Sequence, residues 1–157
     1  MAAVIEGSLD GRGLRIAVAA ARFNELIVER LVAGAERALE ENGVSRDAVD
    51  VIWVPGAFEL PQVARWLAEA GRYDALVCVG CVIRGETPHF EYVAGQAAAG
   101  IERVAVDTGL PVTFGVLTVE TLDQALQRAG GKDGNKGAQA AAAAIELATL
   151  RRRLRGD

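Results

Sequence analysis

The sequence predicts an α/β fold in which helices cover both faces of a parallel sheet. Four short apolar runs alternate with helical patterns from one end of the chain to the other. These runs are almost entirely apolar, which is typical of strands that are buried on both sides. The repeated order of strand and helix favours parallel strands joined by right-handed crossovers. Because no linker or internal repeat interrupts this pattern, we expect one domain over residues 1–157.

Four segments are predicted strands: residues 14–20, 49–54, 75–83 and 112–119. Residues 3–6 also look like a short strand, but the stretch 7–13 contains three glycines that break the chain. We expect this first segment to pair at an edge of the sheet, either in its own subunit or in a neighbouring one.

The first two predicted helices have recognisable ends. Asn24 can cap a helix that stops at Asn42-Gly43. Its apolar stripe recurs at helical spacing and consists of Ile27, Leu31, Ala35, Ala38 and Leu39. Residues 60–70 form the second predicted helix, which ends at Gly71.

Three more helices complete the pattern. Thr87 is the predicted cap of the third helix, with Pro88 at the first helical position, where proline is favoured. Thr121 and Gln124 have the spacing of a capping box, which predicts a short fourth helix. An alanine-rich fifth helix is expected over residues 135–154.

Composition and charge exclude several classes of protein. A composition of 51% hydrophobic and 24% charged residues indicates a globular domain rather than a disordered chain. The net charge of -4 argues against a nucleic-acid partner, which usually needs a broad basic face. Charges or glycines interrupt the longest apolar runs, so we expect no membrane span. We also find no signal-peptide pattern, and we expect a cytoplasmic protein.

The two cysteines, Cys78 and Cys81, have a CxxC spacing that allows two interpretations. Such a pair can serve redox chemistry or bind a metal. Both residues, however, lie in the predicted strand 75–83, and residues three apart on a strand point to opposite faces. We therefore expect two buried structural cysteines and no metal site.

Unusual segments follow three of the predicted strands, where open parallel sheets bind their ligands. The third segment, residues 84–89, contains a glycine, a threonine and free backbone amides at a helix N-terminus, which suits a phosphate. It also contains His89, the only histidine of the chain. An imidazole can pass a proton in either direction, so His89 is a candidate general acid or base.

Other candidates are individually less specific. Phe23 and Phe58 directly follow strands and could stack on a planar heterocycle, or simply pack at the rim of the fold. Glu59 could hydrogen-bond the edge of such a ring, although a carboxylate is favourable at any helix N-terminus. Arg128 precedes the glycine-rich loop 130–137, which by itself could be a turn with solvated charges.

Taken together, these segments resemble the lumazine synthase family over essentially the whole chain. The resemblance rests on five ordered motifs: Arg22-Phe23-Asn24, residues 54–61, residues 80–92, residues 113–118, and Arg128-Ala129-Gly130 with Gly134-Asn135-Lys136-Gly137. The most specific is the stretch 83–90, which reads Ile-Arg-Gly-Glu-Thr-Pro-His-Phe.

The resemblance implies a three-layer, flavodoxin-like fold and a transferase of riboflavin biosynthesis. Such enzymes condense 5-amino-6-(D-ribitylamino)uracil with 3,4-dihydroxy-2-butanone 4-phosphate, and release 6,7-dimethyl-8-ribityllumazine, phosphate and water. They use no metal and no organic cofactor. The resemblance further implies a homo-pentamer, with riboflavin synthase as a candidate partner. Some members of the family stop at pentamers and others join them into icosahedral cages, and the short turn at residues 130–137 resembles that of the caged members, so we expect a cage.

The resemblance also assigns roles to residues of this chain. His89 matches the proton donor. The residues matching the pyrimidine and ribityl site are Phe23, Asn24, Ala57, Phe58, Glu59, Cys81, Val82, Ile83 and Phe114, the last contributed by a neighbouring subunit. The residues matching the phosphate site are Gly85, Glu86, Thr87, Arg128 and Lys136. Gln139 departs from the pattern, because we expect a carboxylate there that pairs with a nearby cation.

Two other functions fit part of the sequence. An archaeal-type riboflavin synthase has the same fold and joins two lumazines, but it has little use for a phosphate segment at residues 85–89. A catalytically inactive flavin-binding or shell protein would not need His89, Arg128 and Phe23.

Overall fold

The computed structural model describes all 157 residues and contains the predicted parallel sheet. Its strand order is β2-β1-β3-β4. The strands are β1 (Ile16–Ala21), β2 (Val49–Val54), β3 (Ala75–Ile83) and β4 (Val112–Val119). All neighbouring pairs are parallel. The bounds predicted for the last three strands are confirmed, and the first strand lies one to two residues later than predicted.

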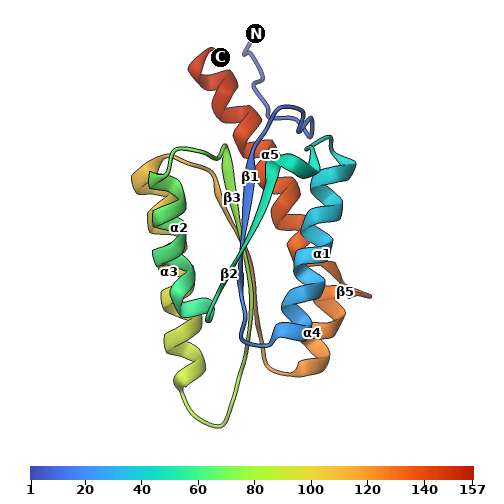
Figure 1. Cartoon of the computed structure of the whole chain (residues 1–157), viewed down its shortest axis with the longest axis vertical. Helices are drawn as coiled ribbons and strands as arrows, with labels where there is room; N and C mark the ends of the chain where they lie inside the picture. The colour runs from blue at the N-terminus through green and yellow to red at the C-terminus, as the bar shows by residue number, and fades with distance from the viewer.

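Helices cover both faces of this sheet (Figure 1). On one face lie α1 (Glu25–Glu41), α4 (Leu122–Arg128) and α5 (Lys136–Arg155), and on the other lie α2 (Leu60–Glu69) and α3 (His89–Thr108). The prediction of a three-layer, flavodoxin-like α/β fold is therefore confirmed. None of the helices has the length and apolarity that crossing a membrane would require.

The sheet divides the apolar core into two parts, and the side chains of β1 alternate between them. Ile16, Val18 and Ala20 pack with the residues of α1 and α5, and the alternating alanines pack with those of α2 and α3. All six residues of β1 are buried, as the apolar run predicts. Strand β2 is different: five of its six residues are only partly buried, because β2 is an edge strand. The expectation that every strand is fully covered is therefore wrong for β2, and also for β4 at the other edge, where Val112 and Phe114 are partly buried and Thr118 is exposed.

Two predicted helix caps are wrong in detail. Asn24 precedes α1, but its side chain does not cap the helix, and its backbone is left-handed with φ 66 and ψ 46. Helix α3 begins at His89, so Pro88 occupies the cap position and not the first helical position. Thr87 lies just before it, and its hydroxyl accepts a 3.4 Å hydrogen bond from the His89 N–H.

The cap predicted for α4 is confirmed, and α5 has a cap that was not predicted. The Thr121 hydroxyl accepts from the Gln124 N–H at 3.1 Å, while Gln124 Oε1 accepts from the Glu120 N–H at 2.7 Å. Asn135 caps α5 by accepting from the Ala138 N–H at 3.0 Å. Between these helices lies a two-stranded sheet that was not predicted, formed by β5 (Ala129–Gly131) and β6 (Gly134–Asn135). Two short 3-10 helices, η1 (Arg46–Ala48) and η2 (Ala57–Glu59), were also not predicted.

The N-terminal segment forms no strand within its own chain. It contacts the last helix instead, where the Ser8 N–H donates to Thr149 Oγ1 at 2.8 Å and Arg153 donates to the Glu6 carbonyl at 2.6 Å. Residues 3–6 therefore pair with no strand of the sheet in this structure. The outer edge of β2 stays unpaired within the chain.

Candidate active site

The segments that follow β1, β2 and β3 meet at the carboxyl end of the sheet, around a cleft of about 590 Å³. We call this the first cleft. It is lined by Phe23, Asn24, Pro55, Gly56, Ala57, Phe58, Glu59, Cys81, Val82, Ile83, Gly85, Thr87, His89, Phe90, Tyr92 and Val93. Eleven of these are residues that the sequence singled out, and the structure brings them together at one cleft. Glu86 lies in the same loop but is not among the residues that line the cleft.

The segment after β1 is held in place by its backbone and by one side chain. The N–H groups of Arg22 and Phe23 donate to the carbonyls of Val54 and Pro55 at 2.7 and 3.1 Å, which extends the pairing of β1 with β2. Asn24 then turns the chain into α1, and its Nδ2 donates to the Cys81 carbonyl at 2.7 Å. This hydrogen bond ties the end of β1 to the end of β3 across the floor of the cleft.

The first cleft presents aromatic rings to solvent. Phe23 is 74% exposed, and Phe58 is 57% exposed on the neighbouring segment. A phenylalanine left this exposed at a concave surface has a ring face free to stack on a planar ligand. Tyr92, which sequence reasoning missed, adds a third exposed ring from the first turn of α3. Helical spacing could have revealed it, because residues 89, 92 and 93 share one face of a helix.

The loop between β3 and α3 has free hydrogen-bond donors. The backbone N–H groups of Gly85, Glu86 and Thr87 donate no hydrogen bond within the chain. His89 follows at the first position of α3 and is exposed to solvent. Amides at the N-terminus of a 20-residue helix attract an anion, because the helix dipole adds to the free donors. The imidazole of His89 therefore lies next to backbone amides that are suited to bind a phosphate.

The remaining predicted residues lie in a separate cleft along β4, with a volume of about 350 Å³. We call this the second cleft. It is lined by Phe114, Val116, Leu117, Thr118, Val119, Arg128, Asp133, Lys136 and Gln139. No residue lines both clefts. Within one chain, the structure thus does not bring Phe114, Arg128 and Lys136 together with His89.

Arg128 is held at the mouth of the second cleft. Its Nη1 donates to the Gln124 carbonyl at 3.1 Å and lies 3.6 Å from Asp133 Oδ2. Gln139, where we expected a carboxylate, also lines this cleft. Asp133, a residue that the sequence did not single out, supplies the carboxylate partner that Gln139 cannot provide.

The structure explains why the motif at residues 134–137 contains an asparagine and a glycine. Asn135 caps α5 and also donates from Nδ2 to the Arg30 carbonyl at 3.1 Å. A side chain on Gly137 would collide with the backbone carbonyl of Leu31, so glycine allows α5 to approach α1. The motif therefore fixes where α5 begins, and with it the position of Lys136.

The two cysteines lie on opposite faces of β3, as predicted. Cys78 packs in the part of the core beside α2 and α3, and Cys81 packs in the part beside α1 and α5. Burial raises the pKa of Cys78 to about 12 and that of Cys81 to about 11, from an ordinary value of 9.0. Protonated sulfurs on opposite faces cannot form the redox pair that the CxxC spacing suggested. The chain contains no group of three His, Cys, Asp or Glu side chains arranged to hold a metal ion.

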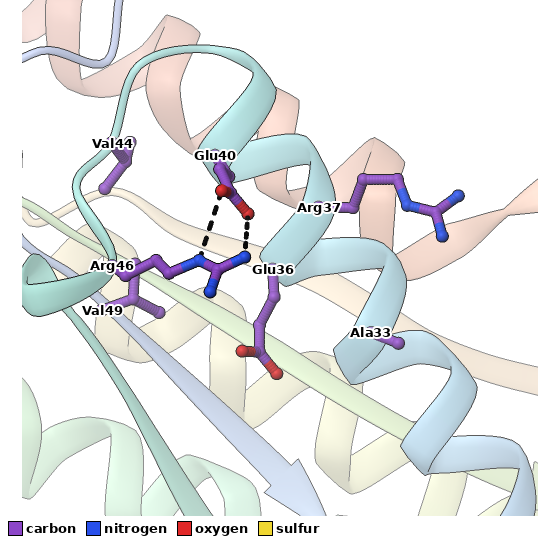
Figure 2. Close-up of a pocket in the computed structure, with 7 residues that line it drawn as sticks. All are labelled: Ala33, Glu36, Arg37, Glu40, Val44, Arg46 and Val49. Carbon is purple, nitrogen blue, oxygen red and sulfur yellow. Dashed lines mark hydrogen bonds and ion pairs between the residues drawn. The ribbon is translucent and has the colours of Figure 1, made fainter.

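A third hollow, beside α1, contains none of the predicted residues (Figure 2). Arg46 reaches into it from the turn before β2 and forms two 3.2 Å hydrogen bonds with the carboxylate of Glu40. Glu36 and Arg37 also line the hollow, which contains no histidine, cysteine, serine or threonine.

Comparison with known protein families gives one match. The family model described as 6,7-dimethyl-8-ribityllumazine synthase matches residues 13–152. All residues that line the first and second clefts lie within the matched range.

Proposed function

The chain belongs to the 6,7-dimethyl-8-ribityllumazine synthase family, a transferase family of riboflavin biosynthesis, and from this we propose that it carries out the complete condensation. The substrates are 5-amino-6-(D-ribitylamino)uracil and 3,4-dihydroxy-2-butanone 4-phosphate. We further propose that residues 1–157 act as one domain. The observation that carries the proposal is the first cleft, where exposed aromatic rings, free loop amides and the only histidine meet.

The first cleft suits the pyrimidine. The rings of Phe23 and Phe58 can stack on the planar heterocycle. Donors and acceptors for its edge come from Glu59 and from the backbone of the segments that also carry the other proposed contacts: Asn24, Ala57, Cys81, Val82 and Ile83. The ribityl chain would lie along the end of β3.

The phosphate of the second substrate suits the loop between β3 and α3. Gly85, Glu86 and Thr87 offer backbone amides there, and Thr87 adds a hydroxyl. Fixed donors aimed at a phosphate stabilise the negative charge that grows as it leaves. Arg128 and Lys136 would add cations, and in our proposal they come from a neighbouring subunit.

The proposed reaction has four steps. The 5-amino group attacks the ketone carbon, and water leaves to give an imine. Elimination of phosphate then leaves an enol, which tautomerises to a carbonyl. The ribitylamino nitrogen attacks this carbonyl, and loss of a second water closes the ring. Each step moves a proton, and His89 at the edge of the first cleft can deliver or accept it. Holding both substrates together supplies much of the remaining acceleration.

We propose that the complete site lies between two subunits. The separation of the two clefts supports this, because residues with roles in one reaction lie apart within a single chain. A neighbour's second cleft would bring Phe114, Arg128 and Lys136 to the first cleft.

The assembly that we propose is a pentamer, joined with others into an icosahedral cage. The unpaired edge of β2 can receive residues 3–6 of a neighbour, because an open strand edge carries unused backbone donors and acceptors. Light scattering after gel filtration tests this proposal against the chain mass of 16.5 kDa. Particles of one or two chains would refute the pentamer, and a pentamer that does not associate further would refute the cage alone.

The reaction is tested by mixing the protein with both substrates and following lumazine fluorescence together with phosphate release. We expect lumazine only when both substrates are present. Riboflavin formed from lumazine alone would indicate an archaeal-type riboflavin synthase. Binding of lumazine or flavin without turnover would indicate a shell or carrier protein. If the protein is a lumazine synthase, riboflavin synthase is the partner that would consume its product.

A further inference from the structure

Arg84 connects the loop between β3 and α3 to elements on both faces of the sheet. Its backbone N–H donates to the Val119 carbonyl at 2.9 Å, at the end of β4. Its Nε donates to Glu120 Oε2 at 2.8 Å, and its Nη1 donates to Glu91 Oε1 at 3.4 Å. Its guanidinium carbon lies 4.5 Å from the centroid of the Phe90 ring. One side chain thus contacts the first turn of α3 and the segment that enters α4. Helices α3 and α4 lie on opposite faces of the sheet (Figure 1).

The loop itself has little other support. All of residues 85–89 are exposed, and a side chain built at Gly85 would meet no atom within 4 Å. The only side-chain hydrogen bond inside the loop is the 3.4 Å contact between the His89 N–H and Thr87. An exposed segment with few contacts moves readily unless its ends are fixed. Arg84 fixes one end directly, and it fixes the other through Phe90 and Glu91, which immediately follow His89.

Arg84 is poorly placed to bind substrate itself. Two carboxylates, Glu91 and Glu120, already face its single positive charge. Its side chain is 37% exposed, the lowest fraction among the arginines in ion pairs, compared with 82% for Arg46. Glu120 is fixed in turn, because its N–H donates to Gln124 Oε1 at 2.7 Å.

We propose that Arg84 is a positioning residue: by holding both ends of the loop, it sets the orientation of His89 relative to the first cleft. This inference rests on the proposed function, in which His89 moves the protons. The planar guanidinium is essential to the arrangement, because it reaches two carboxylates and stacks on a ring at the same time. An ammonium group cannot do all three.

The test compares Arg84→Gln with the matched control Arg46→Gln, which also removes an arginine held by a carboxylate but far from the first cleft. We expect Arg84→Gln to lower kcat about 10- to 100-fold, because small displacements of a reacting group have effects of this size. The control should leave kcat unchanged. Arg84→Lys keeps the charge and the fold, and it should give an intermediate kcat.

The same substitution made in a His89→Ala background decides whether Arg84 acts through the histidine. A positioning role predicts that Arg84→Gln lowers kcat no further there, because the group that it orients is gone. An equal fall of kcat in both backgrounds, or no fall in either, would overturn the proposal.

Glu120→Gln separates positioning from phosphate binding. If Arg84 positions the loop, Glu120→Gln lowers kcat as Arg84→Gln does, and the two effects do not add. If Arg84 instead bound the phosphate, removing Glu120 would free the arginine and lower the KM for the phosphate substrate. That result would overturn the proposal.

Hydrogen exchange provides a readout that does not depend on activity. We expect the amides of residues 85–91 to exchange faster in Arg84→Gln than in wild type or Arg46→Gln. Unchanged exchange there would contradict the role of Arg84 in fixing the loop. An inactive wild-type protein with this change in exchange would refute the proposed function while leaving the structural role of Arg84 intact.

Discussion

The side-chain amide of Asn24 donates a 2.7 Å hydrogen bond to the backbone carbonyl of Cys81, and this contact joins two segments that line the first cleft. Asn24 is the only residue other than glycine with a positive φ. Its left-handed backbone is what directs the amide away from α1 and toward β3. The residue that the sequence suggested as a helix cap thus serves as a tie between two strand ends.

Substitutions at Asn24 should therefore lower the stability of the fold in a definite order. Asn24→Gly loses the hydrogen bond, which is worth about 0.5–1.5 kcal/mol, but accepts the positive φ without strain. Asn24→Ala loses the same hydrogen bond and keeps a Cβ in the left-handed region without the polar side chain by which asparagine tolerates it, which costs roughly 1–2 kcal/mol relative to glycine. Thermal unfolding midpoints at one protein concentration should fall from wild type to glycine to alanine. An alanine variant as stable as the glycine variant would contradict this account.

Replacing His89 by alanine should slow turnover without abolishing it. Amines and ketones condense unaided, and a positioned proton donor typically contributes about 10²–10⁴-fold. Steady-state kinetics of lumazine formation measure the effect. Either a complete loss in a correctly folded variant or an unchanged kcat would argue against His89 as a proton shuttle.

Arg128→Ala should weaken binding of the phosphate substrate far more than binding of the pyrimidine substrate. A charge-assisted hydrogen bond to phosphate is worth roughly 1.5–3 kcal/mol, which corresponds to about a 10- to 150-fold rise in KM. Asp133→Asn is the matched control, because it removes the exposed partner of Arg128 while keeping the cation. Equal losses of affinity for both substrates would count against the assignment.

The buried thiols give a prediction about pH. Unfolded cysteines ionise near 9.0, whereas Cys81 and Cys78 in the fold hold their protons to about 11 and about 12. Their contribution to stability is therefore complete below pH 9 and is lost as the pH rises through the folded-state values. Unfolding midpoints should fall between pH 9 and 11, and less steeply in Cys78→Ala. A thiol reagent that modified the native protein at pH 8 would contradict this burial.

Periodicity and turn chemistry were enough to predict the sheet, because the four strands are apolar runs bounded by glycine, proline and polar residues. The bounds of β3 were correct for this reason. The partial exposure of β2 was missed, because the sequence does not reveal which strand lies at an edge of the sheet. Asn24 was predicted to cap α1 for a similar reason. Its actual hydrogen-bond partner, Cys81, is 57 positions away in the sequence.

The candidate site was predicted unevenly. Residues that directly follow strands could be assigned to the first cleft, since parallel strands end at one edge of the sheet. Asp133 and Arg84 were not singled out, because their importance depends on partners such as Arg128 and Glu120 that only the fold brings near. The division into two clefts also follows from the position of β4 in the sheet and not from any motif.

We propose that each active site lies between two subunits. The first cleft of a chain would form part of one site, and its second cleft would form part of a different site, shared with another neighbour. A variant lacking His89 keeps an intact second cleft, and a variant lacking Phe114 keeps an intact first cleft. In oligomers assembled from both variants, some interfaces would combine an intact His89 with an intact Phe114.

Complementation in such mixed oligomers is the most direct test. His89→Ala and Phe114→Ala chains are unfolded together, refolded as a mixture, and assayed for lumazine formation, with mixing confirmed by mass spectrometry. We predict activity well above that of either variant alone. Confirmed mixing with no gain in activity would contradict the shared site.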